Sequence, residues 1–379
     1  MSSLWGPLAK RYGQERPRKL LALDGGGIRG ILTLEILHSM EKLLAKATGQ
    51  GDHFRLGEYF DYIAGTSTGA IIAAGLARGM SVGELLDFYQ KAGPLMFDKA
   101  ALWKRVQSFY RSEPLAKQLQ KTFGKDTTLA PEHLKCLLLV VTRNATTDSP
   151  WPVSSNPYAK YNASQRSDCN LQIPLWQLIR ASTAAPIFFP PEILTWDKDD
   201  PAKSFVFVDG GMTPYNNPAF LLYRMATLAP YKLGWKTGEE NLLLISVGTG
   251  ASPTATGDVN DPGKNIVSNL AGLPSALMYS AQVDQDINCR TVGRCLHGAP
   301  IDREMGDLIP AAGDTNPRAF RYARYNADIS QKGLKDLGFG DLQSEDVGKL
   351  DAIDQIPSLR KIGRKIGEEI AIGHFAGFV

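Results

Sequence analysis

The sequence has few cysteines and little net charge. Its 379 residues include four cysteines, Cys136, Cys169, Cys289 and Cys295, which show no disulfide framework and indicate reduced structural thiols. No Cys/His spacing suits a metal ion, and the formal charge of +3 is too small to indicate a nucleic-acid surface. We therefore expect no metal site and no DNA or RNA partner.

Long apolar runs are missing as well. No segment approaches the run of about 20 apolar residues that spans a membrane, and the first nineteen residues lack the apolar stretch of a signal peptide. Hydrophobic residues nevertheless make up 43% of the chain, which is enough for a large core. The sequence thus predicts a globular, cytoplasmic protein.

A Gly-Thr-Ser-Thr-Gly pentapeptide is the most informative segment. It lies between a strand-like apolar run, Tyr59 to Ala64, and a helix-like run, Ala70 to Ala77. A G-x-S-x-G turn between a strand and a helix strains the backbone and presents the serine hydroxyl, while Gly65 and Gly69 leave room around it. Ser67 is therefore a candidate nucleophile. A plain tight turn is the alternative interpretation of the same pattern.

A glycine-rich turn lies earlier in the chain. A buried strand is predicted at Lys19 to Leu23 and an amphipathic helix at Ile31 to Ala47, with Asp24 to Gly30 between them. Consecutive glycines at a helix N-terminus let bare backbone N–H groups converge on an anion. The groups expected to form this cradle are three consecutive glycines and one arginine: Gly25, Gly26, Gly27 and Arg29.

The same turn also matches the G-x-G-x-x-G fingerprint of dinucleotide-binding proteins, through Gly25, Gly27 and Gly30. That fingerprint needs an acidic residue at the end of a second strand about 20 positions further on. Glu41 falls inside the first helix, and Asp52 follows a polar stretch that contains no strand. A dinucleotide-dependent oxidoreductase is therefore kept only as a remote alternative.

A third segment supplies a candidate base. Ser204 to Val208 reads as an apolar strand that runs into Asp209, Gly210 and Gly211. The five histidines offer no obvious partner for Ser67, whereas a buried carboxylate can take the proton of a hydroxyl directly. We therefore predict a Ser67/Asp209 dyad. The alternative for Asp209 is an ordinary turn aspartate at the end of a strand.

Together these segments resemble the patatin-like phospholipase family. Asp24 to Gly30 is similar to the family's oxyanion loop, Gly65 to Gly69 to its nucleophile elbow, and Asp209 to Gly211 to its catalytic-aspartate motif. The resemblance covers roughly residues 19–250 and includes further matching segments: Arg180 to Pro186, Asn216 to Pro218, and Leu242 to Gly250.

The resemblance implies a fold and a reaction. The expected fold is a three-layer α/β/α domain at 19–250 with a largely parallel central sheet, preceded by a basic segment at 1–18 and followed by a mainly helical extension at 251–379. Ser67 would attack an acyl ester carbonyl of a membrane phospholipid, Asp209 would activate it, and the glycine loop would stabilise the oxyanion without a cofactor. Ser182 and Ser246 are rival serines outside an elbow, for which packing roles are expected.

One segment suits a membrane surface. Between Phe97 and Lys125, aromatic and basic residues alternate at near-helical spacing, a combination typical of helices that lie on anionic bilayers. The residues expected to face lipid are Trp103, Phe109, Lys104 and Arg105. This pattern predicts peripheral association with the inner face of the membrane in the active enzyme. An ordinary core-packed helix is the alternative.

A second segment suits a nucleotide. Three arginines interleave with aromatic residues in a run that reads as a strand, and such pairs can bind phosphate and stack a base. The residues singled out are Arg318, Arg321, Arg324 and Tyr322. The whole chain is also similar to bacterial patatin-like effectors of anti-phage signalling, which a cyclic nucleotide switches on. That similarity implies a cyclic-nucleotide activator and is compatible with a homo-oligomer. The alternative for the arginine-rich run is a solvated strand face, and the alternative for a nucleotide-activated enzyme is a constitutive lipid esterase.

Overall fold

The computed structural model describes residues 4–97, 114–185, 190–197, 200–251, 265–301, 306 and 317–379. The residues predicted to face a membrane fall outside these ranges: Trp103, Lys104, Arg105 and Phe109. Within the described ranges, no helix combines the length and apolar character needed to cross a bilayer. The same ranges contain no cluster of three or more His, Cys, Asp or Glu side chains suited to a metal ion.

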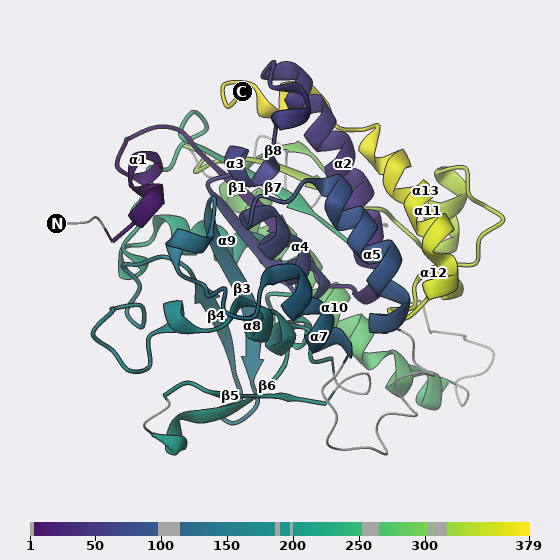
Figure 1. Ribbon diagram of the computed structural model, residues 1–379. Coiled ribbons are helices and arrows are strands. Elements are labelled where there is room, and N and C mark those ends of the chain that lie inside the picture. Colours follow the sequence, from purple (N-terminus) through teal and green to yellow (C-terminus); the bar gives the residue numbers. More distant parts are fainter. Residues whose placement is uncertain are drawn as a thin grey trace.

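A central sheet organises the molecule (Figure 1). In the described residues its strands run in the order β5-β6-β3-β2-β1-β7-β9-β8, and β4 pairs with β3. The five pairings among β3, β2, β1, β7, β9 and β8 are parallel, and β3 pairs antiparallel with β4 and β6. The strand bounds are β1 Arg18–Leu23, β2 Tyr62–Thr66, β3 Leu137–Asn144, β4 Ser149–Ser154, β5 Glu192–Thr195, β6 Ser204–Asp209, β7 Leu242–Val247, β8 Arg294–His297 and β9 Arg321–Tyr325.

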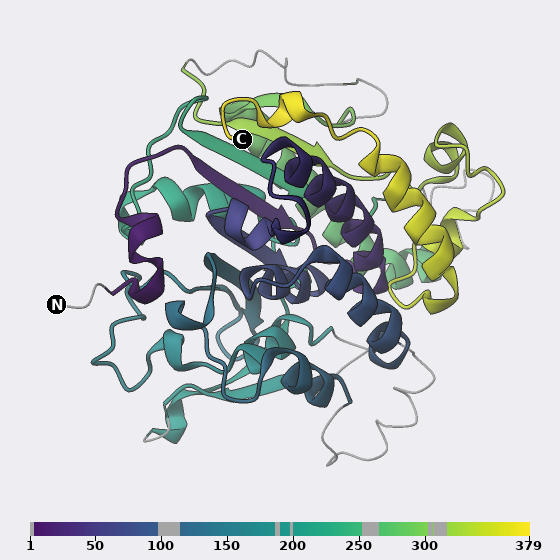
Figure 2. The same ribbon diagram turned by 45° about the horizontal axis from the view of Figure 1, so that its top comes forward.

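Helices cover both faces of this sheet, as Figure 2 shows for the layer on one side. Alternate residues of β1 enter different cores: Leu21 packs with α2, α4 and α5, whereas Leu20 packs with α9. From Leu20 onward β1 is apolar, and β2 and β7 are buried at every position, because neither face of the central sheet meets water there. The three-layer α/β/α fold and its largely parallel sheet are thus confirmed. The helix bounds are α1 Ala9–Tyr12, α2 Gly30–Ala47, α3 Leu56–Tyr59, α4 Thr68–Ala77, α5 Val82–Phe97, α7 Pro114–Phe123, α8 Leu175–Ser182, α9 Ala219–Thr227, α10 Asn265–Val292, α11 Gln331–Asp336, α12 Ser344–Val347 and α13 Ile356–Gly367.

The segment after residue 250 contains helices α10 to α13 and also contributes strands to the central sheet. Two strands, β8 and β9, lie within it, and β9 pairs in parallel with β7 so that the central sheet continues through this segment. Its last long helix, α13, packs on α2 through Leu359, Ile362 and Ile366, which are buried. The sequence predicted a strand at this arginine-rich run but did not indicate that it pairs with the central sheet.

The strand before the elbow is also shorter than expected. The run that begins at Tyr59 starts inside α3, and β2 begins only at Tyr62. Asp61 accounts for the break, because its carboxylate accepts the backbone N–H of Lys19 and pairs with Arg11. These contacts fix the entrance to β2 and therefore the position of the turn at its far end.

Candidate active site

The backbone at Ser67 has the geometry of a nucleophile elbow. Ser67 lies between β2 and α4 with φ 54° and ψ −123°, a backbone conformation that residues other than glycine rarely adopt. The turn needs its glycines because a Cβ at Gly65 would lie 2.1 Å from the carbonyl oxygen of Gly69, and one at Gly69 would lie 2.3 Å from that of Leu23. The result is a serine held at the N-terminus of a buried helix.

The hydroxyl of Ser67 donates to a carboxylate. Its Oγ lies 2.7 Å from Oδ2 of Asp209, and both residues are buried. The sheet register brings them together, because Thr66 pairs with Val141 on β3 and Asp209 pairs with the next residue, Thr142. Two residues 142 positions apart in the chain therefore meet at the ends of β2 and β6, the strands on either side of β3.

Burial tunes the carboxylate. It raises the pKa of Asp209 to about 6, against the lowering effects of the Ser67 hydroxyl, the Gly211 N–H and the charge of Arg180. The Gly211 N–H donates to Oδ1 at 2.6 Å, which fixes the carboxylate and leaves Oδ2 to the serine. A carboxylate with this pKa is a stronger base than a solvated aspartate and is still ionised at neutral pH.

The glycine loop lies against this pair. A Cβ built at Gly25 would lie 3.3 Å from Cβ of Ser67, so the loop backbone adjoins the nucleophile. The N–H of Gly25 donates to the carbonyl of Asn216 at 3.0 Å. Within the described residues, the N–H groups of Gly26 and Gly27 donate to no backbone carbonyl. They are the loop donors available to an oxyanion.

Arg29 is turned toward the loop itself. Its side chain is buried, and its Nε points to the carbonyl oxygen of Gly26 at 3.4 Å. Burial lowers the pKa of Arg29 to about 10, against the raising effect of the Asp24 charge, so the guanidinium stays charged at neutral pH. A residue of the C-terminal segment fixes the backbone after Gly27, because the N–H of Ile28 donates to the carbonyl of Leu350 at 2.9 Å.

The two rival serines have partners that account for them. Ser182 Oγ accepts the N–H of Ser67 at 2.9 Å and donates to the carbonyl of Val141 at 2.6 Å. Ser246 Oγ accepts from Arg324 at 2.6 Å. Ser182 is thus a contact of the elbow that the sequence analysis assigned only to packing.

Sequence reasoning missed two further residues of this site. Asp24 pairs with Arg324 across the sheet, with Nη2 and Oδ2 2.6 Å apart, and the carboxylate is fully buried. Asn216 is also fully buried, and among the described residues neither its Nδ2 nor its Oδ1 has a hydrogen-bond partner. Its Oδ1 lies 2.3 Å from the position of a Gly25 Cβ and 3.0 Å from that of a Gly211 Cβ. The Asn-Asn-Pro triplet after the Asp-Gly-Gly motif was the available signal.

The residues predicted to bind a nucleotide do not gather in one place. Arg318 donates to the carbonyl of Thr291 at 2.9 Å, and Arg321 donates to that of Ala376 at 2.6 Å. Tyr322 is fully buried in an apolar core, on the opposite face of β9 from Arg321 and on the same face as Arg324. Only Arg324 lies both near the glycine loop and on a cavity. The alternation of a buried strand separates side chains that a surface run would place together.

An elbow serine, a buried acidic partner and a glycine loop at one edge of a mostly parallel sheet are features of a serine-type acyl hydrolase. The family model described as patatin-like phospholipase matches residues 21–223, more than half of the chain. The protein belongs to this family and is a lipid ester hydrolase. This membership favours hydrolysis over the dinucleotide chemistry considered for the glycine loop.

Three phospholipases are similar to this chain over different shares of their length. A cGAMP-activated phospholipase of Vibrio cholerae serotype O1 is 30% identical, over 88% of this chain and 88% of its own length. A cGAMP-activated phospholipase of Escherichia coli is 30% identical, over 62% of this chain and 63% of its own. An intracellular phospholipase A2 of Caenorhabditis elegans is 30% identical, over 69% of this chain but 23% of its own. The chain thus spans most of the first relative and under two thirds of the other two.

Proposed function

We propose that the protein hydrolyses fatty-acyl esters of membrane phospholipids through a Ser67/Asp209 dyad and that a cyclic nucleotide activates it. The observation that carries the first part is the 2.7 Å hydrogen bond from Ser67 Oγ to Asp209 Oδ2 at a strained strand-to-helix turn. Family membership defines the substrate as a lipid ester. The activator is proposed from the relatives described as cGAMP-activated.

In the first half-reaction, Asp209 takes the proton of the Ser67 hydroxyl as Oγ attacks the ester carbonyl carbon. The carbonyl oxygen gains the negative charge and accepts hydrogen bonds from the N–H groups of Gly26 and Gly27. Collapse of the tetrahedral intermediate breaks the bond to the glycerol oxygen, which leaves with the proton from Asp209. The products of this step are a lysophospholipid and an acyl ester on Ser67.

In the second half-reaction, Asp209 takes a proton from water as the water oxygen attacks the acyl carbon. The same N–H groups stabilise the second oxyanion, and Ser67 Oγ leaves and recovers the proton from Asp209. The fatty acid is released and the enzyme is restored. Every proton transfer in this scheme uses one carboxylate, so we propose that hydrolysis requires no cofactor.

The dyad works without histidine because the carboxylate is buried and aimed. Gly211 fixes Oδ1, and the pKa of about 6 makes Asp209 a base of about the strength of an imidazole. Ser182 supports the nucleophile by accepting its N–H. These contacts support an orienting role for Ser182 and Gly211 and proton transfer by Asp209.

The test is fatty-acid release from mixed phospholipid vesicles by wild type, Ser67→Ala and Asp209→Asn, each with and without cGAMP. We expect release by wild type to require cGAMP and each variant to lose at least about 1,000-fold in rate. Equal fatty-acid release by wild type and Ser67→Ala would contradict the assignment of Ser67 as the nucleophile. Full Ser67-dependent release without a nucleotide would contradict the activator and leave a constitutive lipase.

A further inference from the structure

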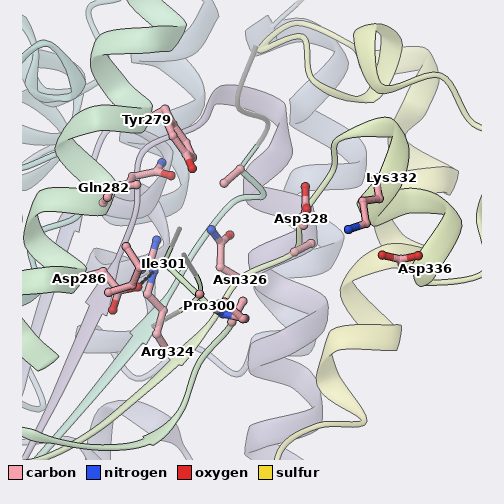
Figure 3. Close-up of a pocket in the computed structure, with 15 residues that line it drawn as sticks. Tyr279, Gln282, Asp286, Pro300, Ile301, Arg324, Asn326, Asp328, Lys332 and Asp336 are labelled. Atoms are coloured by element: carbon pink, nitrogen blue, oxygen red, sulfur yellow. Dashed lines mark ion pairs between the residues drawn. The ribbon is translucent and has the colours of Figure 1, made fainter. Parts of the chain in front are cut away.

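A cavity of about 400 Å³ lies on the far side of Arg324 from the glycine loop. Figure 3 shows its side chains converging from α10, from the end of β9 and from α11. Polar groups line much of it, and Ala299, Pro300 and Ile301 form an apolar wall. The polar side chains drawn there are Tyr279, Gln282, Asp286, Arg324, Asn326, Asp328, Lys332 and Asp336. None of the residues predicted for ester hydrolysis lines this cavity.

The lining suits a purine nucleotide. Carboxamides such as those of Gln282 and Asn326 can pair with the hydrogen-bonding edge of a base, and carboxylates such as that of Asp328 can accept from the ring N–H and amino groups of guanine. Tyr279 and the apolar wall offer flat surfaces for a base. Lys332 supplies a cation for a phosphate at the outer end, on exposed helix α11.

One carboxylate of the lining, that of Asp286, already has cationic partners. Asp286 is paired with Arg290 through two contacts, Nε to Oδ1 and Nη2 to Oδ2, each 3.0 Å long. Arg324 Nε lies 3.9 Å from the same carboxylate. This pairing offsets the charge of Asp286, so that carboxylate repels an anionic ligand less than an unpaired one would.

One hydrogen-bonded route joins the cavity to the glycine loop through β9. Arg324 lines the cavity and also holds Asp24, with Nη1 to Oδ1 at 3.3 Å and Nη2 to Oδ2 at 2.6 Å. Asp24 directly precedes Gly25 in the chain. A movement of the Arg324 guanidinium therefore changes the anchor of the loop that adjoins Ser67.

A second route passes through the turn after β7. Asn326 lines the cavity, and its Oδ1 accepts the N–H of Gly250 at 2.9 Å. The neighbouring Thr249 donates through Oγ1 to the carbonyl of Gly25 at 3.0 Å. Both routes end on the two residues that open the glycine loop, and the cavity side of both comes from β9 and the residue that follows it.

We propose that this cavity binds a purine base of the activating cyclic dinucleotide and that Arg324 and Asn326 transmit its occupancy to the glycine loop. The inference rests on the proposed nucleotide activation and specifies its site. In this account, base contacts at Asn326 and Arg324 set the Asp24 and Thr249 anchors, and these place the N–H groups of Gly26 and Gly27 toward the oxyanion. The nucleotide thereby acts on the chemical step rather than on lipid binding.

The test combines cGAMP binding by calorimetry with vesicle hydrolysis for the full chain. Lys332→Ala and Tyr279→Ala should weaken cGAMP binding at least tenfold, whereas Lys335→Ala, on the same helix but outside the cavity, should bind like wild type. Arg324→Lys keeps the charge but loses the two-point grip on Asp24. It should bind cGAMP within threefold of wild type and lose at least tenfold of the cGAMP-stimulated kcat, with KM for lipid within twofold.

The outcomes separate this inference from the proposed function. The proposed binding site would be wrong if cGAMP activates the wild type and both Lys332→Ala and Tyr279→Ala bind cGAMP as tightly as the wild type does. Full activation of a folded Arg324→Lys variant would overturn the route through Asp24. If Arg324→Lys does not fold, Ser246→Ala is the second variant, because it removes one partner of the guanidinium at 2.6 Å and should lower stimulated kcat without weakening binding. If no nucleotide activates the wild type, the proposed activation itself is wrong.

Discussion

At Ser67 the chain accepts a strained backbone with φ 54° and binds the serine from two sides. Ser182 accepts a hydrogen bond from the N–H of Ser67, and Asp209 accepts one from its hydroxyl, so the Ser67 side chain has one defined direction. Strain of this kind persists only where surrounding contacts over-determine it, and here a helix and two strand ends do so. The consequence is a nucleophile already oriented before substrate arrives.

The pKa of Asp209 predicts the pH dependence of the reaction. Because burial raises it to about 6 and the base must be unprotonated, kcat/KM should rise with pH through about 6 and level off above 7. Below pH 5.5 the slope should approach tenfold per pH unit. The measurement is kcat/KM on a soluble short-chain ester from pH 4.5 to 8 with wild type and Asp209→Asn. A flat wild-type profile across that range would contradict the assignment of the base.

Ser182 gives a second prediction at this scale. Ser182→Ala leaves the N–H of Ser67 without its acceptor inside a buried site, which should lower kcat about tenfold and destabilise the fold by about 1–2 kcal/mol. Steady-state kinetics and thermal melts measure the two effects. The control is Ser204→Ala, which removes a hydroxyl that donates to Thr195 on the sheet edge and should leave both quantities near wild type. An unchanged kcat in Ser182→Ala would mean that the elbow positions Ser67 by itself.

Much of the site's local structure could be predicted from sequence, because glycine patterns and strand-end motifs are local. The elbow, the loop and the strand before Asp209 lie where the motifs place them. The engagement of the Gly25 N–H by Asn216, and the contacts of Ser182 and Arg324, could not be predicted. They join segments from different strands, and no periodicity in a single chain reports which strand ends become neighbours.

At the scale of elements, the elbow depends on close packing between α4 and the end of β1. A Cβ at Gly69 would lie 2.3 Å from the carbonyl oxygen of Leu23 and 2.7 Å from that of Asp24. Gly69→Ala should therefore push the glycine loop away from Ser67, with a loss of at least about 100-fold in kcat and about 1–3 kcal/mol in stability. The matched control is Gly83→Ala on α5, where a Cβ would lie 3.8 Å from Oγ of Ser81. Equal activity in both variants would show that the packing does not control the site.

A second element-scale contact joins α2 to α13. Glu35 is buried on α2 and pairs with Arg360 and Arg364 on α13. The hydrogen bonds and charges of both arginines lower the pKa of Glu35, although burial opposes them. A lowered pKa means that this stabilisation is present above the carboxyl's ordinary pKa and is lost as pH falls through the folded value.

Glu35→Gln should accordingly lower the free energy of unfolding by about 1.5–3 kcal/mol at pH 7. The difference from wild type should shrink as the pH falls below 4. Denaturant unfolding at several pH values measures it, with Glu345→Gln on exposed α12 as the control. A difference that does not change with pH would contradict the ionic origin of the contact.

At the scale of the whole molecule, the C-terminal segment is part of the sheet rather than an appendage. β9 lies beside β7, α13 covers α2, and Leu350 holds the glycine loop. The expected helical extension was only part of the structure, since arginine-rich β9 has the composition of a surface strand but lies inside the fold. The family match ends at residue 223, so these contacts are contributed by the rest of the chain.

Nucleotide binding should therefore stabilise the whole fold. A ligand that binds only the folded protein adds about 2.7 kcal/mol at 100 times its Kd. Saturating cGAMP should raise Tm by several degrees in wild type and in Lys335→Ala. The shift should fall in Lys332→Ala at the same concentration, as followed by differential scanning fluorimetry. An equal shift in all three proteins would place the nucleotide elsewhere.

The most direct test of the account is to identify the residue that becomes covalently modified. A fluorophosphonate probe reacts with an activated serine, and peptide mass spectrometry then locates the phosphonyl group. The account predicts a label on Ser67, its loss in Ser67→Ala, and labelling at least about 100-fold slower in Asp209→Asn. A label on Ser182 or Ser246, or labelling of Asp209→Asn at the wild-type rate, would contradict the Ser67/Asp209 dyad.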